Sequence, residues 1–361
     1  MTAKTRPAPR RLTAKRVFRI GIMVIVLFSI FAVFSSALGF HVAFRRWQEP
    51  AYNLAMSYTS DDAEGYPRVP VSFPSGDHTL RGYLYGTENR QGLVIVVNGF
   101  HATQNGHLGE VFYFLDQGWS VLTYDTTGTG ESDGTSVIGL EQFRRDLLAA
   151  LDFVSETPET ENLPLFLYGH SAGGYAVATV CDDPRVSASV CISGFNSARE
   201  LMLHLGKKYA GPLAQVGYPY MCLYDHFLFG AEGLLTAEKQ LQGAVHPVLV
   251  VHGASDDTVP LPVSIYGNCD SVENENVTIM LMEEEFRGEH STVWLTADAA
   301  RQLEQLSDYA DQMRSRYGSA FPEDVAWQLA ENVRCSNVLL RTLDEKFMDE
   351  ISMFFRSALQ T

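Results

Sequence analysis

The sequence predicts an α/β protein in which a mostly parallel sheet is covered by helices on both faces. Two observations predict this class: six short apolar runs recur along the chain, and segments of helical composition lie between them. Continuous apolar strands are typical of parallel sheets, whose strands are buried on both faces. A third observation, a long apolar stretch near the N-terminus, adds one helix outside this sheet.

Composition and charge describe a globular body with an unusual beginning. The chain has 361 residues, of which 46% are hydrophobic and 19% charged, enough apolar sequence to bury a sizeable core. Its net charge is -16, yet the first 50 residues hold nine of the 27 Lys and Arg and one of the 43 acids. The rest therefore carries 18 basic and 42 acidic residues, a charge of -24. Because so acidic a body repels phosphate backbones, nucleic acid is not an expected partner.

The first element is a transmembrane helix, expected over residues 20–44 after a basic tail, residues 1–19. Residues 20–40 are 21 positions without a charge, which as a helix reach about 31 Å, the thickness of a hydrocarbon core. Seven Lys and Arg precede this run and two follow it, so the N-terminus is expected in the cytoplasm and the body outside, at the cell membrane. A cleaved signal peptide is the alternative, because residues 35–37 are small; the length of the apolar run favours an anchor.

The elements of the body follow a linker, expected over residues 45–68. An opening hairpin is predicted at residues 69–73 and 79–85, around Pro74-Ser75-Gly76-Asp77. The apolar runs predict six strands, at residues 93–97, 120–124, 165–168, 188–192, 248–251 and 277–281. Helical apolar stripes are formed by Leu140, Phe143, Leu147, Leu148, Leu151 and Val154 and, near the C-terminus, by Leu343, Phe347, Ile351, Phe354 and Ala358. The body is thus predicted to run from residue 69 to residue 361.

Two helical insertions, residues 195–245 and 299–342, interrupt this alternation. Pro322-Glu323-Asp324 is a helix-start signal in the second, which is interpreted as a stabilising pair of helices, with a second lid as the alternative. The aromatic side chains of the first could either wall an apolar acyl pocket or form the core of a helical cap: Phe195, Tyr209, Tyr218, Tyr220, Tyr224, Phe227 and Phe229. Lys207 and Lys208 are interpreted as a solvated face.

Cysteine usage indicates no metal site. The five cysteines form no C-x-x-C pair and no His/Cys cluster at ligand spacing: Cys181, Cys191, Cys222, Cys269 and Cys335. In an exported body up to two disulfides could form, and the sequence does not give their pairing. Cys191 lies in an apolar run and is expected as a buried thiol.

A serine at the end of an apolar strand is the strongest chemical signal. Gly169-His170-Ser171-Ala172-Gly173 follows one apolar run and precedes residues 175–181, which can be helical. A sharp strand-to-helix turn needs glycine on either side and lifts the serine hydroxyl out of the sheet. The pattern alone is weak in a chain with 29 glycines, and its place between strand and helix makes Ser171 a candidate nucleophile.

Partners for this serine lie downstream. A serine hydroxyl is a poor nucleophile at neutral pH and needs a base, which an acid must orient. Asp256 and Asp257 follow the apolar run 248–251, and His290 follows the run 277–281. Because loops at the carboxyl ends of parallel strands meet at one edge of the sheet, these side chains can reach Ser171.

These motifs resemble those of α/β-hydrolases and are most similar to the lipase and serine-aminopeptidase branch, which includes monoacylglycerol lipases. The resemblance covers roughly residues 69–295 and the last helix. It implies an α/β-hydrolase fold with a helical cap, Ser171 as nucleophile, Asp256 as orienting acid and His290 as general base, with no metal or organic cofactor. The family's H-G-x-x-D-x-x-V-P loop resembles residues 252–260, which favours Asp256 over Asp257.

Two further segments carry the resemblance. Residues 96–100 resemble the family's first oxyanion loop, which implies that the backbone N–H groups of Phe100 and Ala172 hold an oxyanion. Residues 125–134 resemble a glycine-rich structural turn. Asn98 stands where most relatives carry His, so different hydrogen bonding behind the oxyanion loop, and lower activity, are expected. Four other histidines are interpreted as structural, with substrate contact as the alternative for the first two: His101, His107, His170 and His252.

The apolar N-terminal run and the resemblance together lead us to expect a membrane-anchored serine hydrolase that cleaves a carboxyl ester, lipid esters included, through an acyl-enzyme on Ser171. A peptidase or amidase of the same fold is one alternative. A non-catalytic, membrane-tethered binding protein on a hydrolase scaffold is the alternative from another class. The expected partners are a small-molecule ester, lipid or peptide substrate and, through the N-terminal helix, the membrane.

Overall fold

The computed structural model describes residues 13–48, 63–317 and 342–360. Its strands are β1 (Arg68–Ser75), β2 (His78–Tyr85), β3 (Leu93–Val97), β4 (Ser120–Tyr124), β5 (Leu165–His170), β6 (Val186–Ile192), β7 (Val248–Gly253) and β8 (Val277–Met282). Its helices are α1 (Ala14–Ala43), α2 (Leu108–Asp116), α3 (Gln142–Glu156), α4 (Ala172–Ala178), α5 (Ala198–Ala210), α6 (Leu213–Phe229), α7 (Ala237–Leu241), α8 (Ile265–Asn268), α9 (Ala297–Tyr317) and α12 (Glu345–Ser357).

The strands form one eight-stranded sheet in the order β1-β2-β4-β3-β5-β6-β7-β8. β1 pairs with β2 and β2 with β4 in antiparallel fashion, and all other pairs are parallel. The predicted hairpin and the six predicted strands are all present. β3, β4, β5 and β7 are buried along their whole length, as their apolar runs predict, whereas β8 is partly exposed because it lies at the edge.

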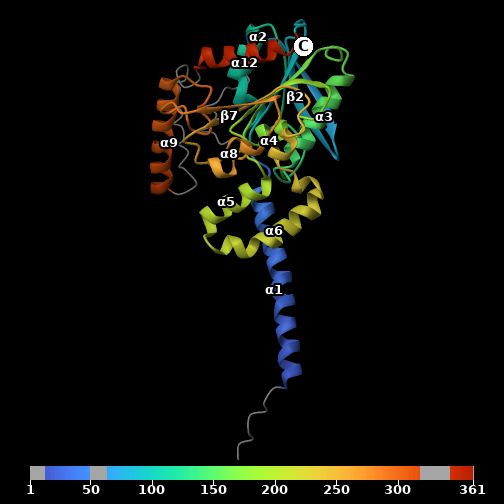
Figure 1. Cartoon of the computed structure of the whole chain (residues 1–361), viewed down its shortest axis with the longest axis vertical. Coiled ribbons are helices and arrows are strands. Elements are labelled where there is room, and N and C mark those ends of the chain that lie inside the picture. Colours follow the sequence, from blue (N-terminus) through green and yellow to red (C-terminus); the bar gives the residue numbers. More distant parts are fainter. Residues whose placement is uncertain (1–12, 49–62, 318–341, 361) are drawn as a thin grey trace, which may run out of the picture.

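Helices cover both faces of this sheet (Figure 1), so the predicted fold class is confirmed. Successive side chains of a strand enter opposite layers: Ile95 and Leu122 pack into one, Val94 and Val121 into the other. The first layer holds the predicted stripe of α3 and the second the stripe of α12. Phe143, Leu147, Leu151 and Val154 of the first stripe and Phe347 and Ile351 of the second are buried, whereas the predicted Leu148 and Phe354 are only partly buried.

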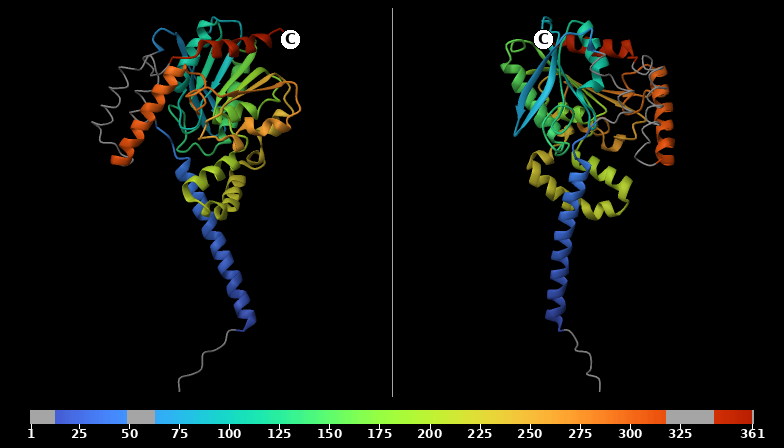
Figure 2. Two further views of the ribbon diagram at one scale, coloured as in Figure 1. Left: turned by 60° about the vertical axis from the view of Figure 1, so that its left-hand side comes forward. Right: turned by 180° about the vertical axis from the view of Figure 1, so that it is seen from behind.

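α1 leaves the body as a single straight helix, and α5 and α6 lie beside its end nearest the body (Figure 2). Among the described residues it is the one helix long and apolar enough to cross a membrane, and none of its most apolar window is buried. A membrane anchor and a secretory signal share these properties. The end of α1 and the residue that caps it are part of the protein core, since Phe40 and Phe44 are both 5% exposed.

The helices between β6 and β7 form a cap, which contains a buried ion pair close to the body. The Arg199 guanidinium on α5 donates to the Asp225 carboxylate on α6 over 2.6 Å, and Asp225 is fully buried. Glu141, which precedes α3 in the body, is 2% exposed beside them. Burial, and next the Asp225 carboxylate, raise the pKa of Glu141 from its ordinary 4.5 to about 8. An acid that keeps its proton at neutral pH therefore lies where the body meets the cap.

We expect Glu141→Gln to remove a pH dependence of stability. Because the folded protein holds this proton more tightly than the unfolded chain, the wild-type free energy of unfolding should fall as the pH rises from about 4.5 to about 8. The side-chain amide of the variant cannot lose a proton, so this decline should flatten. Denaturant unfolding across this pH range measures it. The control is Glu156→Gln, at the exposed other end of α3, and an equal flattening there would contradict the assignment to Glu141.

The second insertion begins and ends at neighbouring points of the body. Leu295 and Leu343 form an antiparallel bridge, and the Thr296 amide donates to the Thr342 carbonyl over 3.0 Å. Of the helices expected in residues 299–342, α9 (Ala297–Tyr317) is described; the predicted helix start at Pro322 falls outside the described residues. The chain thus leaves and re-enters the body at one place, directly after the loop that carries His290.

Candidate active site

Ser171 occupies a sharp turn between β5 and α4. Its backbone has a positive φ of 56° with a ψ of -114°, a conformation that residues other than glycine rarely adopt. The Ser171 amide donates to the Ile192 carbonyl over 2.8 Å, and its carbonyl accepts from the Tyr175 amide over 3.0 Å, which holds the turn at both ends. Residues 165–170 and 172–181 are buried, whereas Ser171 is partly exposed. α4 begins at Ala172, three residues before the helical run that the sequence indicates.

The glycines around this serine permit a close approach of backbones. A Cβ at Gly169 would lie 2.4 Å from the Gly173 carbonyl oxygen, and one at Gly173 would lie 2.1 Å from the Val97 carbonyl oxygen. Real Cβ atoms do not come so close, so only glycine fits both positions. The turn is therefore pressed against the carboxyl end of β3, as the motif predicts.

The loop after β3 lies directly beside Ser171. A Cβ at Gly99 would be 3.1 Å from the Ser171 Cβ. Asn98 secures the loop from behind, because its buried side-chain amide donates to the Tyr124 carbonyl over 3.0 Å. Within the described residues, the N–H groups of Phe100 and Ala172 donate to no other group. Two unused donors thus flank the serine, where the resemblance places the oxyanion hole.

Asp256 and His290 are brought together by the loops after β7 and β8. His290 Nδ1 lies 2.7 Å from Asp256 Oδ2, and the Asp256 side chain is fully buried. The other carboxylate oxygen, Oδ1, accepts from the amides of Thr258 and Val259 over 3.0 and 2.8 Å. Because a carboxylate can only accept, His290 Nδ1 is the donor in this contact, and in the neutral imidazole Nε2 then has a free lone pair. This is the tautomer that can take a proton from a hydroxyl.

His170 links the His290 loop to the serine turn. Its Nε2 lies 2.9 Å from the His290 carbonyl oxygen, and the two imidazole centroids are 4.9 Å apart. Burial, and next the His290 ring, hold the pKa of His170 well below its usual range, so His170 is neutral and donates through Nε2. Within the described residues, neither the Ser171 hydroxyl nor Nε2 of His290 has a hydrogen-bond partner.

Two side chains near Asp256, those of His252 and Asp257, do not share its contact with His290 Nδ1. His252 Nε2 lies 3.6 Å from Asp256 Oδ2 and donates to the Val259 carbonyl over 2.9 Å. Burial lowers the pKa of His252, so this ring is neutral and does not cancel the charge of Asp256. Asp257 has a side chain that is 79% exposed, and in the described part of the chain its ion pair is with Lys208, at 3.8 Å. Of the two acids, Asp256 alone is placed to orient His290.

The other singled-out side chains have structural environments. His107 pairs with Glu110 over 2.7 Å, both of them buried. His101 is stacked between Phe100 and Trp47, with centroid separations of 3.9 and 5.7 Å. Of the cap aromatics, Phe195 and Phe229 are buried and Tyr209 and Phe227 face outward, 84% and 81% exposed, so these four do not share one enclosed pocket.

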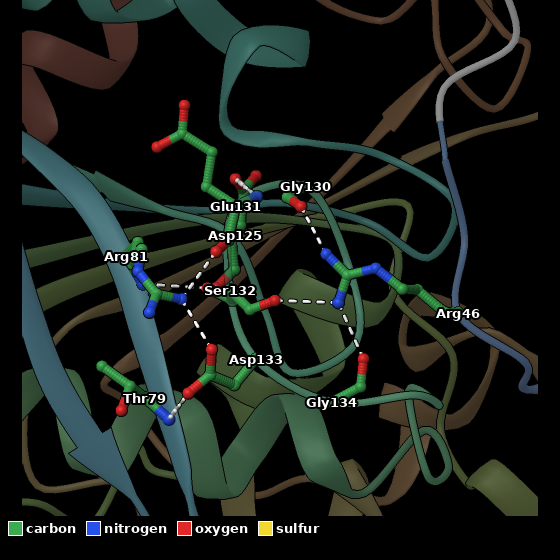
Figure 3. Close-up of polar contacts among 9 residues, drawn as sticks. All are labelled: Arg46, Thr79, Arg81, Asp125, Gly130, Glu131, Ser132, Asp133 and Gly134. Atoms are coloured by element: carbon green, nitrogen blue, oxygen red, sulfur yellow. Dashed lines mark hydrogen bonds and ion pairs between the residues drawn. The ribbon is translucent and has the colours of Figure 1, made fainter.

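The glycine-rich turn at residues 125–134 is held by Arg46, just beyond α1 (Figure 3). Its Nη1 donates to the carbonyls of Ser132 and Gly134 over 2.9 and 2.7 Å, and its Nη2 to that of Gly130 over 2.6 Å. From inside the turn, Asp125 accepts from the Glu131 amide over 2.8 Å. The turn is thus occupied by protein groups, in keeping with a structural role.

We expect Arg46→Met to loosen this turn. The variant keeps an apolar stem but removes three charge-assisted hydrogen bonds, and at a half-buried site we expect a loss of about 2 kcal/mol of stability. Hydrogen exchange at the amides of residues 128–136 should rise in the detergent-solubilised full chain. Arg45→Met is the matched control, since Arg45 is exposed and its side chain makes no hydrogen bond in the described part of the chain. An equal rise in both variants would contradict the role given to Arg46.

Sequence reasoning missed that the end of α1 packs against the candidate site. The Phe44 ring lies 5.4 Å from that of Phe100 on the oxyanion loop, and the Trp47 amide donates to the Gly128 carbonyl over 3.1 Å. The linker expected over residues 45–68 therefore begins with residues docked on the body; residues 49–62 fall outside the description. Nothing in the sequence signals the hydrogen bond from Trp47, because a backbone carbonyl accepts it, and nothing pairs the Phe44 ring with that of Phe100.

No group of His, Cys, Asp and Glu side chains in the described residues could hold a metal ion. The cysteines in this part of the chain, Cys181, Cys191, Cys222 and Cys269, are free thiols, and Cys335 falls outside it. Cys191 is fully buried, as its apolar run predicts. The chemistry open to this edge of the sheet is that of a serine, a histidine and a carboxylate.

The mixed sheet with helices on both of its faces is an α/β-hydrolase fold. Residues 88–223 match a family described as serine aminopeptidase, S33. Among solved structures, the Pyrococcus furiosus esterase Pf2001 aligns over 73% of this chain and 95% of its own, with a TM-score of 0.51 at 16% identity. That likeness shows the fold.

Curated relatives match a shorter segment. The polyketide transferase grgF of a Penicillium species is 30% identical over 136 residues, 36% of this chain and 46% of the relative. The polyketide transferase af380 of Aspergillus fumigatus is 30% identical over 131 residues, 35% of this chain and 45% of the relative. The match thus spans less than half of the length of these relatives.

Proposed function

We propose that this protein is a membrane-anchored serine hydrolase that cleaves a carboxyl ester, lipid esters included, through an acyl-enzyme on Ser171. The observation that carries the proposal is the 2.7 Å contact of His290 Nδ1 with the buried Asp256 carboxylate, in a loop that His170 ties to the serine turn. Such an arrangement supports nucleophilic catalysis because the acid fixes the tautomer of the base. Catalytic hydrogen bonds are often long without substrate, and the one from Ser171 to His290 is expected to form when substrate binds.

The chemistry follows from these roles. Nε2 of His290 takes the hydroxyl proton as Ser171 Oγ attacks the ester carbonyl carbon. The proton then passes to the leaving alcohol as the ester C–O bond breaks, and Ser171 keeps the acyl group. Water attacks this second ester in the same way and releases the acid. The N–H groups of Phe100 and Ala172 stabilise the oxyanion in both halves, and losing one such donor typically costs about 3 to 4 kcal/mol.

Acyl transfer is a second candidate function, favoured by the names of four of the six curated relatives, three polyketide transferases and an acyltransferase; the other two are named putative phosphoribosyl transferases. It uses the same acyl-enzyme, with an acceptor alcohol in place of water. Product analysis separates the two functions: the hydrolase releases free acid from the ester alone. A transferase forms a new ester when primary alcohols are added and releases little acid without them.

A fluorophosphonate probe tests the acyl-enzyme. Such probes phosphonylate activated serines, so we expect covalent labelling of the full-length chain, with the modified peptide containing Ser171. Folded protein that takes up no probe would favour a non-catalytic binding protein. A panel of p-nitrophenyl esters of rising acyl length, compared with aminoacyl amides, then separates an esterase from a peptidase or amidase.

The anchor and its orientation belong to the same proposal. α1 is proposed to remain attached at the cell membrane with its basic N-terminal end in the cytoplasm and the body outside, which the charge asymmetry of the sequence supports. Contacts of Phe40, Phe44 and Arg46 with the body favour retention over cleavage. Protease added to intact cells should therefore degrade the body. Protection of the body would contradict this orientation.

A further inference from the structure

The cap helix α6 carries an apolar stripe on its surface. Leu213, Val216, Tyr220, Leu223 and Phe227 recur every three or four residues and so share one face of the helix. Four of them are largely exposed: Leu213 by 74%, Val216 by 53%, Leu223 by 58% and Phe227 by 81%. Such a contiguous exposed apolar face marks an interaction surface. We call these five side chains the α6 stripe.

Charge is almost absent around this stripe. α6 contains no Lys, Arg or Glu, and its single acid, Asp225, is fully buried against Arg199. Entry of the stripe into an apolar environment would therefore desolvate no formal charge. At the adjoining end of α5, Lys207 and Lys208 are exposed, and Tyr209 is 84% exposed. Basic and aromatic side chains beside an apolar face are typical of helices that lie in a membrane interface.

The stripe is continuous with the apolar surface of α1. Near the end of α1, Tyr224 of α6 lies 2.7 Å from His41 Nε2 through its hydroxyl. Further along α1, the stripe residue Tyr220 meets Phe28, with ring centroids 6.2 Å apart, and its hydroxyl lies 3.4 Å from that of Ser29. Ser29 precedes Phe40 by eleven residues, about 16 Å of helix. α6 thus contacts α1 well inside the charge-free run of residues 20–40.

Depth decides what covers the stripe. Beside these contacts α1 exposes Phe31, Phe34 and Leu38 by 67%, 68% and 56%, side chains that only lipid can cover if α1 spans a bilayer. Whatever surrounds α1 at the level of Ser29 also surrounds Tyr220. At that depth polar groups need internal partners, and the hydroxyls of Ser29 and Tyr220 supply each other with one.

We propose that α6 lies in the half of the membrane nearest the body, with the α6 stripe against lipid acyl chains. The inference rests on the proposed retention of α1 as an anchor and is otherwise independent of the catalytic residues. The cap is then a second membrane contact, held at a fixed depth by α1. A second copy of the chain on the stripe is the alternative that the experiment must separate.

Spin labels on the full-length chain in phosphatidylcholine vesicles test this depth. The labelled variants are Leu223→Cys on the stripe, Phe31→Cys on α1 and Met353→Cys on α12, with accessible native cysteines replaced by alanine. Met353 is the matched control because it is 56% exposed and lies on a helix at the opposite end of the body from α1 (Figure 1). Oxygen concentrates in lipid and a nickel chelate in water, so the collision rates of each label with the two reagents report its surroundings.

We expect oxygen collisions to exceed nickel collisions at positions 31 and 223, with the order reversed at position 353. Lipid exposure at position 31 with water exposure at position 223 would overturn the inference and leave the anchor standing. Water exposure at both positions would overturn the anchor itself. Protection of position 223 from both reagents would place protein on the stripe, and would likewise overturn the inference.

Discussion

Replacing Ser171 by alanine should lower kcat for ester hydrolysis by at least about 10⁴-fold and abolish fluorophosphonate labelling. The change removes one oxygen atom, the proposed nucleophile, from a turn fixed by the Ser171 amide and carbonyl rather than by the side chain. Stability should therefore stay near that of the wild type. Single-turnover kinetics with a p-nitrophenyl ester would show no burst of p-nitrophenol.

The matched control for this variant is Ser291→Ala. Ser291 is exposed and directly follows His290 in the same loop, so it tests the general effect of losing a hydroxyl near the site. We expect wild-type turnover and labelling. If Ser171→Ala kept most of its turnover while folded, the acyl-enzyme mechanism would be wrong for this chain.

Replacing Asp256 by asparagine should lower kcat by about 10³- to 10⁴-fold with a small change in KM. The amide preserves the shape of the carboxylate but can present N–H to His290, which favours the tautomer with the proton on Nε2. That tautomer cannot accept the Ser171 proton. The loss arises while His290 and Ser171 are both unchanged, so activity should separate from folding.

Asp257→Asn is the matched control for Asp256→Asn. Asp257 is adjacent in sequence, but its side chain is 79% exposed, and its carboxylate lies 3.8 Å from Lys208 Nζ. We expect near-normal kinetics. A large loss in Asp257→Asn together with a small one in Asp256→Asn would reverse the assignment of the orienting acid.

The sheet was accessible from sequence because burial on two faces leaves an unambiguous pattern. The strands at residues 93–97 and 120–124 end where their apolar runs end, and most of the predicted stripe of α3 is buried. The loops after β5, β7 and β8 follow from parallel topology. Their convergence brings His290 to Asp256, and the glycines at 169 and 173 are needed where the motif places them.

Contacts between distant segments could not be predicted from sequence. Arg46 reaches carbonyls 84 to 88 residues away, and carbonyls are the same in every residue. The exposed side of α6 was hidden for a different reason: an apolar periodicity gives the angle of a face and not what covers it. The aromatic residues of the cap fitted a pocket and a core equally well for that reason.

The bridge between Leu295 and Leu343 closes the second insertion at its base, directly after the loop that carries His290. Arg287, which lies in the same loop as His290, pairs with Asp344, the residue that caps α12. The loop is therefore held to the last helix by a contact across the insertion. The position of the imidazole is thus fixed by contacts on both sides of the insertion, and the first turns of α9 belong to the core through Ala299 and Ala300.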